Sequence, residues 1–258
     1  MQMQRQNPAA GATLGGRTLV ITRPAGTAAA LARKVRAQGG VPMLLPGLSL
    51  RGASDPAAAR TALEQALADD LLMFTSPAAV AFAAALSPLL TSSTVLAVGH
   101  GTARALQRHG ISAPLVPARQ DSEGLLDHPA LRELAGQRVA LIGAPGGRGL
   151  LGEQLVMRGA QLRELHVYRR VAPRLDRRHI DALLQLPPSA LVLLSSAEAL
   201  NHLCRLLPAP ALARLLAATA VVSSERLAAA ASAAGFARVL RAASALSADL
   251  LDAAARAG

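Results

Sequence analysis

The sequence predicts an α/β fold built from two copies of one parallel-sheet arrangement. Three observations support this: short unbroken apolar runs alternate with helical patterns, glycine or Ser/Thr residues follow the runs, and the pattern recurs after about 120 positions. Unbroken apolar runs are typical of strands in parallel sheets that helices cover on both faces. We therefore expect a duplicated α/β chain.

The clearest block lies between residues 136 and 170. It contains an apolar strand (139–142), a glycine-rich turn (143–149), an amphipathic helix (150–158) and a second strand that runs to Tyr168. The turn lies where the carboxyl edge of the sheet would meet a helix N-terminus. Ligands bind at that edge of such sheets, and anions are favoured there because free N–H groups point outward.

A matching block lies between residues 16 and 46. Its expected elements are a strand at 19–21, a helix at 27–38 and a strand at 41–45. The helix places Ala28, Leu31, Ala32 and Val35 on one face, which is amphipathic spacing. A shift of about 120 positions places Gly16 on Gly136 and Gly39 on Gly159. We name the earlier block A and the later one A′.

A second pair of blocks, B and B′, follows the same logic. In B we expect strand 71–74, helix 78–86, strand 95–98 and helix 103–109; in B′ we expect strand 191–194, helix 197–206, strand 220–222 and helix 227–234. Ser76 falls on Ser196 after the same shift, and Gly110 and Gly235 are both expected at helix ends, where glycine is favoured. Spacing alone leaves open whether A pairs with B or with B′.

Length and cysteine content narrow the class of protein. For 258 residues, two small domains are the more natural expectation. The single cysteine, Cys204, excludes a disulfide framework and a cysteine-rich metal site, and we expect it to be a small buried hydrophobic residue. Residues 1–15 lack the apolar core of a signal peptide, and no uncharged apolar run is long enough to span a bilayer. We expect a flexible tail there and a cytoplasmic protein with no membrane partner.

The formal net charge of +11 comes almost entirely from arginine. A GC-rich genome could produce this composition, and so could selection for a polyanionic partner. Nucleic-acid binding usually requires clustered basic residues and aromatic platforms, whereas these arginines are scattered and aromatic residues make up only 2%. Because the guanidinium fork also matches carboxylates, a small polycarboxylate is the favoured partner, with no nucleic acid.

Small hydroxyl or glycine pairs recur where a strand ends and a helix begins. They are Thr22/Arg23, Thr75/Ser76, Gly101/Thr102, Gly146/Gly147, Ser195/Ser196 and Ser223/Ser224. Each could be an ordinary helix N-cap. Together, at the carboxyl edges of two domains, they would line a cleft with positive helix ends, each favouring an anion by roughly 0.3–1 kcal/mol.

Three further side chains are candidates for chemistry. Arg23 and Arg148 lie within such turns and could bind carboxylates bidentately, or could be ordinary surface arginines. Tyr168 is the only tyrosine; it could donate a proton to a leaving hydroxyl or simply pack between domains.

Metal and nucleotide signals are weak. The six histidines show no metal-ligand spacing. The turn at 143–149 reads G-x-x-G-G-x-G rather than the dinucleotide fingerprint, although Glu164 follows at a plausible distance. A cofactor-free enzyme fits better, and a nucleotide-binding or small-anion-binding α/β protein is the alternative.

An ordered set of short motifs resembles the uroporphyrinogen-III synthase family. The motifs are Thr22-Arg23-Pro24, Phe74-Thr75-Ser76-Pro77 with Val80, Val98-Gly99 with Thr102-Ala103, Asp121-Ser122-Glu123-Gly124-Leu125-Leu126, Gly147-Arg148 and Val167-Tyr168-Arg169-Arg170. The resemblance extends from about residue 16 to the C-terminus. Ala78 and Gly101 depart from residues that are common in the family.

The resemblance implies two flavodoxin-like domains joined by a two-stranded connector, with the chain crossing over so that A pairs with B′ and B with A′. The expected domains are 16–46 with 172–258, and 52–166, with connectors near 47–51 and 167–171. Family members are hydro-lyases that cyclise hydroxymethylbilane, a linear tetrapyrrole polycarboxylate, to uroporphyrinogen III with inversion of ring D. They use no cofactor or metal, and we expect a monomer.

The resemblance also suggests roles for individual residues. Tyr168 matches the family tyrosine suspected of assisting departure of the hydroxyl. The expected substrate-binding residues are Arg23, Thr75, Ser76, Gly101, Thr102, Gly147, Arg148, Ser195, Ser196, Ser223 and Ser224.

Overall fold

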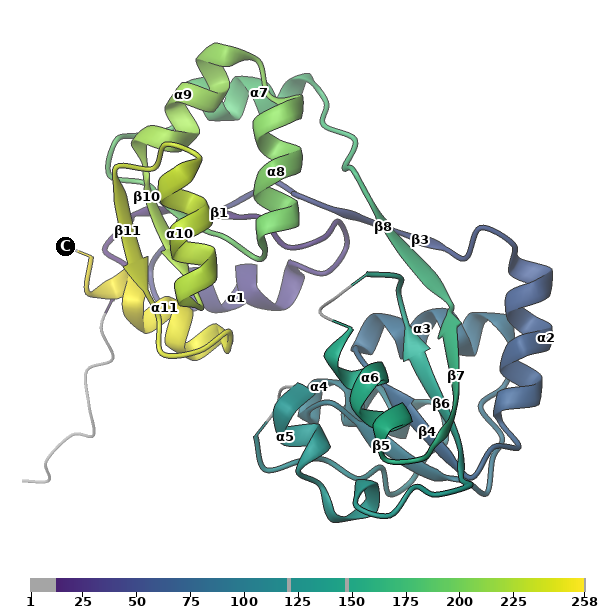
Figure 1. Ribbon diagram of the computed structural model, residues 1–258. Helices are drawn as coiled ribbons and strands as arrows, with labels where there is room; N and C mark the ends of the chain where they lie inside the picture. The colour runs from purple at the N-terminus through teal and green to yellow at the C-terminus, as the bar shows by residue number, and fades with distance from the viewer. Residues whose placement is uncertain (1–12, 120–121, 147–148, 258) are drawn as a thin grey trace, which may run out of the picture. The chain divides into compact units, whose positions relative to one another are not determined.

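The computed structural model describes residues 13–119, 122–146 and 149–257, which form two compact units (Figure 1). Unit 1 comprises the described chain up to Ser49 and again from Val171, and unit 2 runs from Leu50 to Arg170. Both contain parallel sheets covered by helices, so the predicted fold class is confirmed. The predicted domain limits stay a prediction, because compactness alone does not show that a segment folds independently. Within the described residues, no helix is both long and apolar enough to span a bilayer.

Unit 1 contains a five-stranded parallel sheet in the order β11-β10-β9-β1-β2. Its strands are β1 (Thr18–Ile21), β2 (Val41–Leu44), β9 (Leu191–Leu193), β10 (Thr219–Val222) and β11 (Arg238–Arg241). Its helices are α1 (Ala29–Ala37), α7 (Arg177–Leu184), α8 (Ala197–Leu206), α9 (Ala209–Ala217), α10 (Glu225–Ala233) and α11 (Ser247–Ala255).

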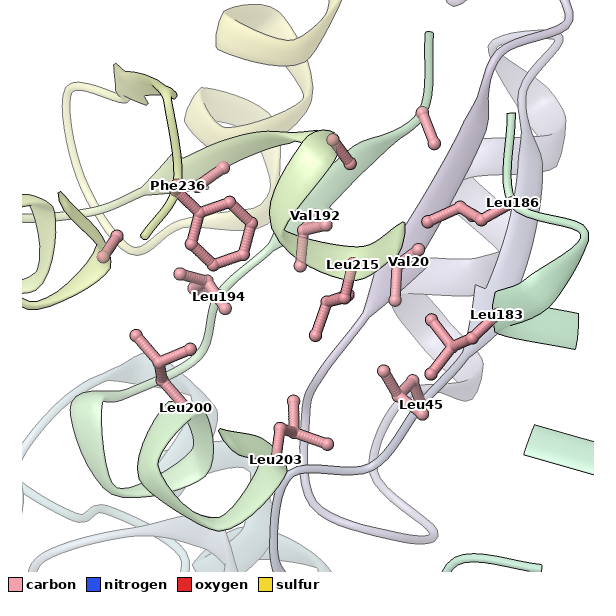
Figure 2. Packing of buried hydrophobic residues seen from close by; sticks show 14 of the residues in the cluster. Val20, Leu45, Leu183, Leu186, Val192, Leu194, Leu200, Leu203, Leu215 and Phe236 are labelled. Carbon is pink, nitrogen blue, oxygen red and sulfur yellow. The ribbon is translucent and has the colours of Figure 1, made fainter. Parts of the chain in front are cut away.

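Both faces of the unit 1 sheet are buried. Val20 and Val192 point to the face that packs against α7, α8 and α9 through residues such as Leu183, Leu203 and Leu215 (Figure 2). The alternate strand residues Leu19, Ile21, Leu191 and Leu193 contact α1 and α11 on the other face. Burial on both faces explains why these strands read as unbroken apolar runs. The predicted buried stripe of α1, which includes Leu31 and Val35, is confirmed.

Unit 2 contains a four-stranded parallel sheet in the order β5-β4-β6-β7. Its strands are β4 (Leu71–Phe74), β5 (Thr94–Ala97), β6 (Arg138–Gly143) and β7 (Gln161–His166). Its helices are α2 (Pro56–Ala66), α3 (Pro77–Leu86), α4 (His100–Arg108), α5 (Ser122–Leu126), the 3-10 turn η1 (Pro129–Leu131) and α6 (Leu150–Met157). Phe74 and Ile142 pack on the side of α2 to α4, whereas Met73 and Val139 pack on the side of α5 and α6.

The two copies of the repeat cross over between the sheets. β1 and β2 of block A lie in one sheet with β9 and β10 of block B′, and β4 and β5 of block B lie with β6 and β7 of block A′. A separate two-stranded sheet pairs β3 (Ser49–Gly52) with β8 (Tyr168–Val171). The pairing that spacing left open is thereby settled in the sense that the family resemblance implied.

Several predicted boundaries differ from the structure by one to three residues, and two of these differences affect predicted site residues. The strand expected to run to Tyr168 ends at His166, and Tyr168 opens β8 after Val167, whose N–H bonds back to Gly143 and whose carbonyl accepts from Ala53. The helix expected from residue 103 begins at His100, because the N–H groups of residues 102 and 103 already bond to the Gly99 carbonyl.

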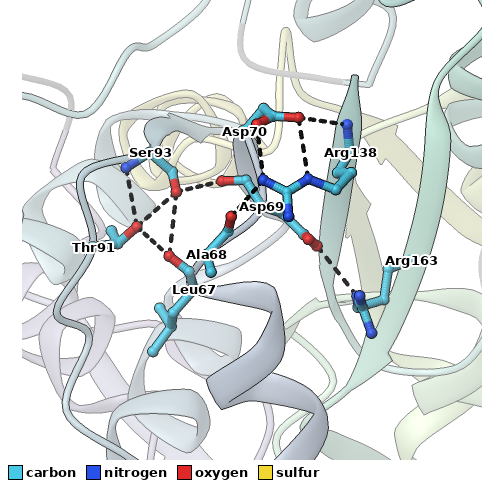
Figure 3. Close-up of polar contacts among 8 residues, drawn as sticks. All are labelled: Leu67, Ala68, Asp69, Asp70, Thr91, Ser93, Arg138 and Arg163. Carbon is cyan, nitrogen blue, oxygen red and sulfur yellow. Dashed lines mark hydrogen bonds and ion pairs between the residues drawn. The ribbon is translucent and has the colours of Figure 1, made fainter. Parts of the chain in front are cut away.

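A polar network closes the amino edge of the unit 2 sheet (Figure 3). Arg138, the first residue of β6, donates from Nη2 to Asp70 Oδ1 at 3.0 Å, and Arg163 Nε lies 3.2 Å from Oδ2 of the buried Asp69. The Arg138 hydrogen bonds hold the pKa of Asp70 below its usual value. These charges therefore satisfy one another at the edge opposite the carboxyl ends of the strands.

Candidate functional site

A cavity of about 460 Å³ lies at the carboxyl edge of the unit 2 sheet. Its lining combines residues after β4 and β6, the outer residues of β7, the start of β8 and the first turn of α6. Parallel α/β sheets bind ligands at this edge. Of the predicted site residues, the cavity brings together Thr75, Ser76 and Tyr168.

Tyr168 is held from two sides. It is buried, and its ring stacks on that of Phe82 with centroids 5.4 Å apart and an interplanar angle of 11°. Its hydroxyl lies 3.2 Å from Ser76 Oγ, which accepts the Ala79 N–H at 3.0 Å as the N-cap of α3. The phenol thus reaches the cavity wall in a set orientation.

Thr75 ties two neighbouring strands together beside this tyrosine. Its Oγ1 donates to the Ile142 carbonyl at 3.1 Å. A Cβ placed on Gly143 would lie 2.5 Å from the Oγ1 of Thr75, so only glycine allows this close approach without displacing Thr75.

The glycine-rich turn opens α6 as expected. Gly146 and Gly149 have φ of +80° and +69°, a left-handed conformation that favours glycine. Gly149 is the N-cap of α6 and supplies no side-chain cap, so this helix end faces the cavity with backbone N–H groups. The predicted binding residues Gly147 and Arg148 lie outside the described residues.

Three cavity residues were missed as candidates for tetrapyrrole binding or catalysis. Glu164 and His166 occupy one side of β7, with His166 Nε2 3.8 Å from Glu164 Oε2, and Arg170 Nη2 donates to the Pro145 carbonyl at 3.0 Å. From the sequence, Glu164 was a candidate only as the acidic residue of a nucleotide site. The i, i+2 spacing of Glu164 and His166 next to Tyr168 is the signal that could have identified them.

Gly101 and Thr102 lie in the first turn of α4, and Thr102 is buried. Neither contributes to the described lining of the cavity. Their position inside a helix, rather than in the turn before it, follows from the earlier start of α4.

The predicted site residues that belong to unit 1 lie at the carboxyl edge of the unit 1 sheet. Ser196 and Ser224 are the N-caps of α8 and α10, and half-buried Ser223 follows β10. Ser195 forms a network with the buried Thr22, whose Oγ1 accepts the Ser195 N–H at 2.9 Å and donates to Leu193 O at 2.9 Å. The Thr22–Ser195 hydrogen bonds therefore join the end of β1 to the end of β9.

Arg23 is half-buried at the same edge. Its Nη2 donates to Ser247 Oγ at 3.2 Å, in the first turn of α11, and desolvation lowers the pKa of its guanidinium. No carboxylate within the described residues forms an ion pair with it. An ionised carboxylate from a ligand would suit this position.

The described part of the chain contains no group of three or more His, Cys, Asp or Glu side chains placed to hold a metal ion. What the cavity offers is instead a phenol, hydroxyls, an arginine, a Glu–His pair and a helix N-terminus. This set can bind carboxylates and deliver a proton at one point.

The family model described as "Uroporphyrinogen-III synthase HemD" matches residues 29–252. Uroporphyrinogen-III synthase of Escherichia coli K12 is 31% identical over 207 residues, which cover 74% of this chain and 80% of that protein. The enzyme of the same name from Salmonella typhimurium LT2 is 32% identical over 165 residues, covering 62% of this chain and 67% of that protein.

Solved structures show a similar fold. A uroporphyrinogen-III synthetase from Helicobacter pylori 26695 gives a TM-score of 0.58 at 16% identity, covering 92% of this chain and 97% of that one. A mutant uroporphyrinogen III synthase from the extremely thermophilic bacterium Thermus thermophilus gives 0.55 at 22% identity, covering 93% and 98%. With the family model matching most of the sequence, the chain belongs to the uroporphyrinogen-III synthase family.

Proposed function

We propose that this protein is a hydro-lyase that cyclises hydroxymethylbilane to uroporphyrinogen III and water, with inversion of ring D, as a step of tetrapyrrole biosynthesis. Family membership supports the reaction, and one observation supports where it takes place: the Tyr168 phenol lines a cavity beside the N-terminus of α6. A substrate with acetate and propionate groups on every ring suits such a helix end and Arg170, which lines the same cavity.

The chemistry asks little of the protein beyond one proton and good positioning. The C–O bond of the terminal hydroxymethyl group breaks, the electron pair leaves with oxygen, and the Tyr168 proton completes the departing water. The cationic carbon that results bonds to the substituted α-carbon of ring D and gives a spiro intermediate. The bond from that α-carbon to its original methylene bridge then breaks, and the bridge bonds to the free α-carbon of ring D, which inverts the ring and closes the macrocycle. The proton released when the pyrrole ring regains aromaticity returns to the phenolate, so the enzyme ends unchanged. Holding the two ends together supplies the remaining rate enhancement.

The positions of several described residues support their proposed substrate-binding roles. In unit 2, Thr75 and Ser76 would act from the cavity wall, and Gly101 and Thr102 from the start of α4. Gly147 and Arg148 stay predicted binding residues. In unit 1, Arg23 with Ser195, Ser196, Ser223 and Ser224 would bind carboxylates at the edge of that sheet. We further propose that the protein acts as a cytoplasmic monomer without a cofactor, which size-exclusion chromatography with light scattering and turnover by metal-free protein would test.

The decisive experiment supplies purified protein with hydroxymethylbilane and separates the type I and type III products by chromatography. We expect type III to predominate over the type I isomer that forms spontaneously. Tyr168→Phe should lower kcat at least tenfold with a small change in KM, because it removes one proton donor and keeps the ring. Exclusive type I product from the parent protein would refute the proposed function, and full turnover by Tyr168→Phe would refute the role of the phenol.

A further inference from the structure

The hydroxyl of Tyr168 has one hydrogen-bond partner among the described residues, Ser76 Oγ at 3.2 Å. Ser76 Oγ already accepts the Ala79 N–H at 3.0 Å. A serine hydroxyl has one hydrogen and two acceptor positions. The Ser76 hydrogen is therefore available for the phenol oxygen, and the two hydroxyls can share their bond in either direction.

We propose that Ser76 is a positioning residue that donates its hydrogen to the Tyr168 oxygen and so leaves the phenol's own hydrogen directed at the cavity. This inference rests on the proposed function, which needs a proton from Tyr168. If Tyr168 donated to Ser76 instead, the phenol hydrogen would point at Ser76 Oγ and could not be transferred to the substrate. Donation from Ser76 also stabilises the phenolate that remains after proton transfer.

The ring of Phe82 completes the arrangement. Its stacking on Tyr168, at 5.4 Å and 11°, restricts the phenol to one plane, and both Phe82 and Ser76 belong to the α3 segment. The same short segment therefore fixes the ring and the direction of its hydrogen bond. The proline at the first position of α3 keeps this helix start in place, since its fixed φ suits a first helical turn.

The duplicated chain contains an internal comparison. Ser196 is the counterpart of Ser76 in the repeat: φ and ψ are −167° and 161° against −167° and 160°, and its Oγ accepts the Ala199 N–H at 3.1 Å. Within the described part of the chain, the Ser196 hydroxyl has no second partner. A cap needs only the first bond, so the bond to Tyr168 is an addition specific to Ser76.

The hydrogen bond from Ser76 to the ionised Tyr168 oxygen can be tested spectroscopically. Tyr168 is the only tyrosine and the chain has no tryptophan, so the alkaline rise of tyrosinate absorbance reports this phenol alone. If Ser76 donates, Ser76→Ala should move the titration midpoint upward by about one pH unit, because a hydrogen bond to the charged form is lost. An unchanged or lower midpoint would overturn the proposal. Far-UV circular dichroism at each pH verifies that the protein stays folded.

Matched variants separate the hydrogen bond from the cap. Ser76→Gly removes the hydroxyl at little cost to the cap, because glycine is itself tolerated at the N-cap position. It replaces Ser76→Ala if that variant does not fold. Ser76→Thr keeps a hydroxyl and should show the same tyrosinate titration midpoint as the parent protein. Asp55→Ala removes the cap of α2 in the same unit, where Asp55 Oδ1 accepts the Ala58 N–H at 3.0 Å, and should leave midpoint and turnover unchanged.

Kinetics provide the second test. Ser76→Ala should lower kcat about tenfold with KM within about twofold, and should cause no further loss in a Tyr168→Phe background, because both changes remove the same function. Losses that multiply in the double variant would show that Ser76 acts independently of Tyr168. If the parent protein forms no uroporphyrinogen III, the proposed function fails, while the absorbance titration still decides whether Ser76 donates to the ionised Tyr168 oxygen.

Discussion

Replacing the buried Thr22 with valine should destabilise unit 1 by about 2 kcal/mol. Thr22 is fully buried at the end of β1, and valine keeps its shape while deleting the hydroxyl. That hydroxyl donates to Leu193 O and accepts from Ser195 N–H, each at 2.9 Å. Leu193 O retains the Thr22 N–H at 3.3 Å, so the larger loss is the Ser195 N–H, and an unsatisfied buried group costs about 1–3 kcal/mol.

Urea unfolding followed by far-UV circular dichroism measures this loss as a lower midpoint. Thermal unfolding should show a melting temperature lower by about 4–8 °C for a loss of that size. The data should be fitted with two transitions, because two units can unfold in separate steps.

Thr27→Val is the matched control for this substitution. The Thr27 hydroxyl donates to the Pro24 carbonyl at 2.8 Å but is exposed, so water replaces it and the expected change is within about 0.5 kcal/mol. If Thr22→Val is no more destabilising than Thr27→Val, the hydroxyl does not hold β1 to β9 and the reasoning fails.

Three further outcomes are expected. Gly47→Ala should lower the free energy of unfolding, measured in urea, by about 1–3 kcal/mol. The added Cβ would lie 2.5 Å from the Cβ and 2.9 Å from the Cα of Ala199, and the helix backbone there cannot move without disturbing its packing. An unchanged unfolding midpoint would contradict the packing described. Arg138 lowers the pKa of Asp70 in the folded state, so the Asp70 carboxylate contributes fully to folding stability at neutral pH, and this contribution is lost as pH falls below about 4. The stability difference between the parent protein and Asp70→Asn should therefore shrink below that pH. A difference that grows on acidification would disprove the assignment. Arg23→Lys keeps a positive charge without the bidentate fork and should raise KM severalfold with kcat nearly unchanged, whereas a normal KM would remove Arg23 from the binding residues.

Local patterns predicted most of the elements, for identifiable reasons. The strands β1, β4, β6 and β9 are largely apolar because helices cover both faces of their sheets, and such runs are visible in any linear reading. The strand β11 was missed because it is an edge strand with exposed arginines at both ends and half-buried residues between them. In unit 2 the corresponding position is only an isolated bridge between Leu96 and Leu115.

The candidate site was predicted in part. Ser76 and Tyr168 were both candidates, yet their contact could not be foreseen, because they are 92 residues apart and meet only through the pairing of β4 with β6 and the turn into β8. The same holds for Thr22 and Ser195, which are 173 residues apart. Glu164 and His166 entered the site because β7 presents alternate residues to one side at the sheet edge.

The sequence by itself determined the α/β class, the duplication and the N-cap serines of α3, α8 and α10. Apolar periodicity and capping act over a few neighbouring positions, and the duplication is visible as the same pattern repeated about 120 positions later. Only the tertiary structure decided which copies share a sheet and which hydroxyls meet. Those contacts depend on the order of strands, and strand order is set by long-range packing that spacing along the chain does not encode. The crossed pairing of β1 with β9 and of β4 with β6 is therefore the feature that places Tyr168 beside Ser76 and Thr22 beside Ser195.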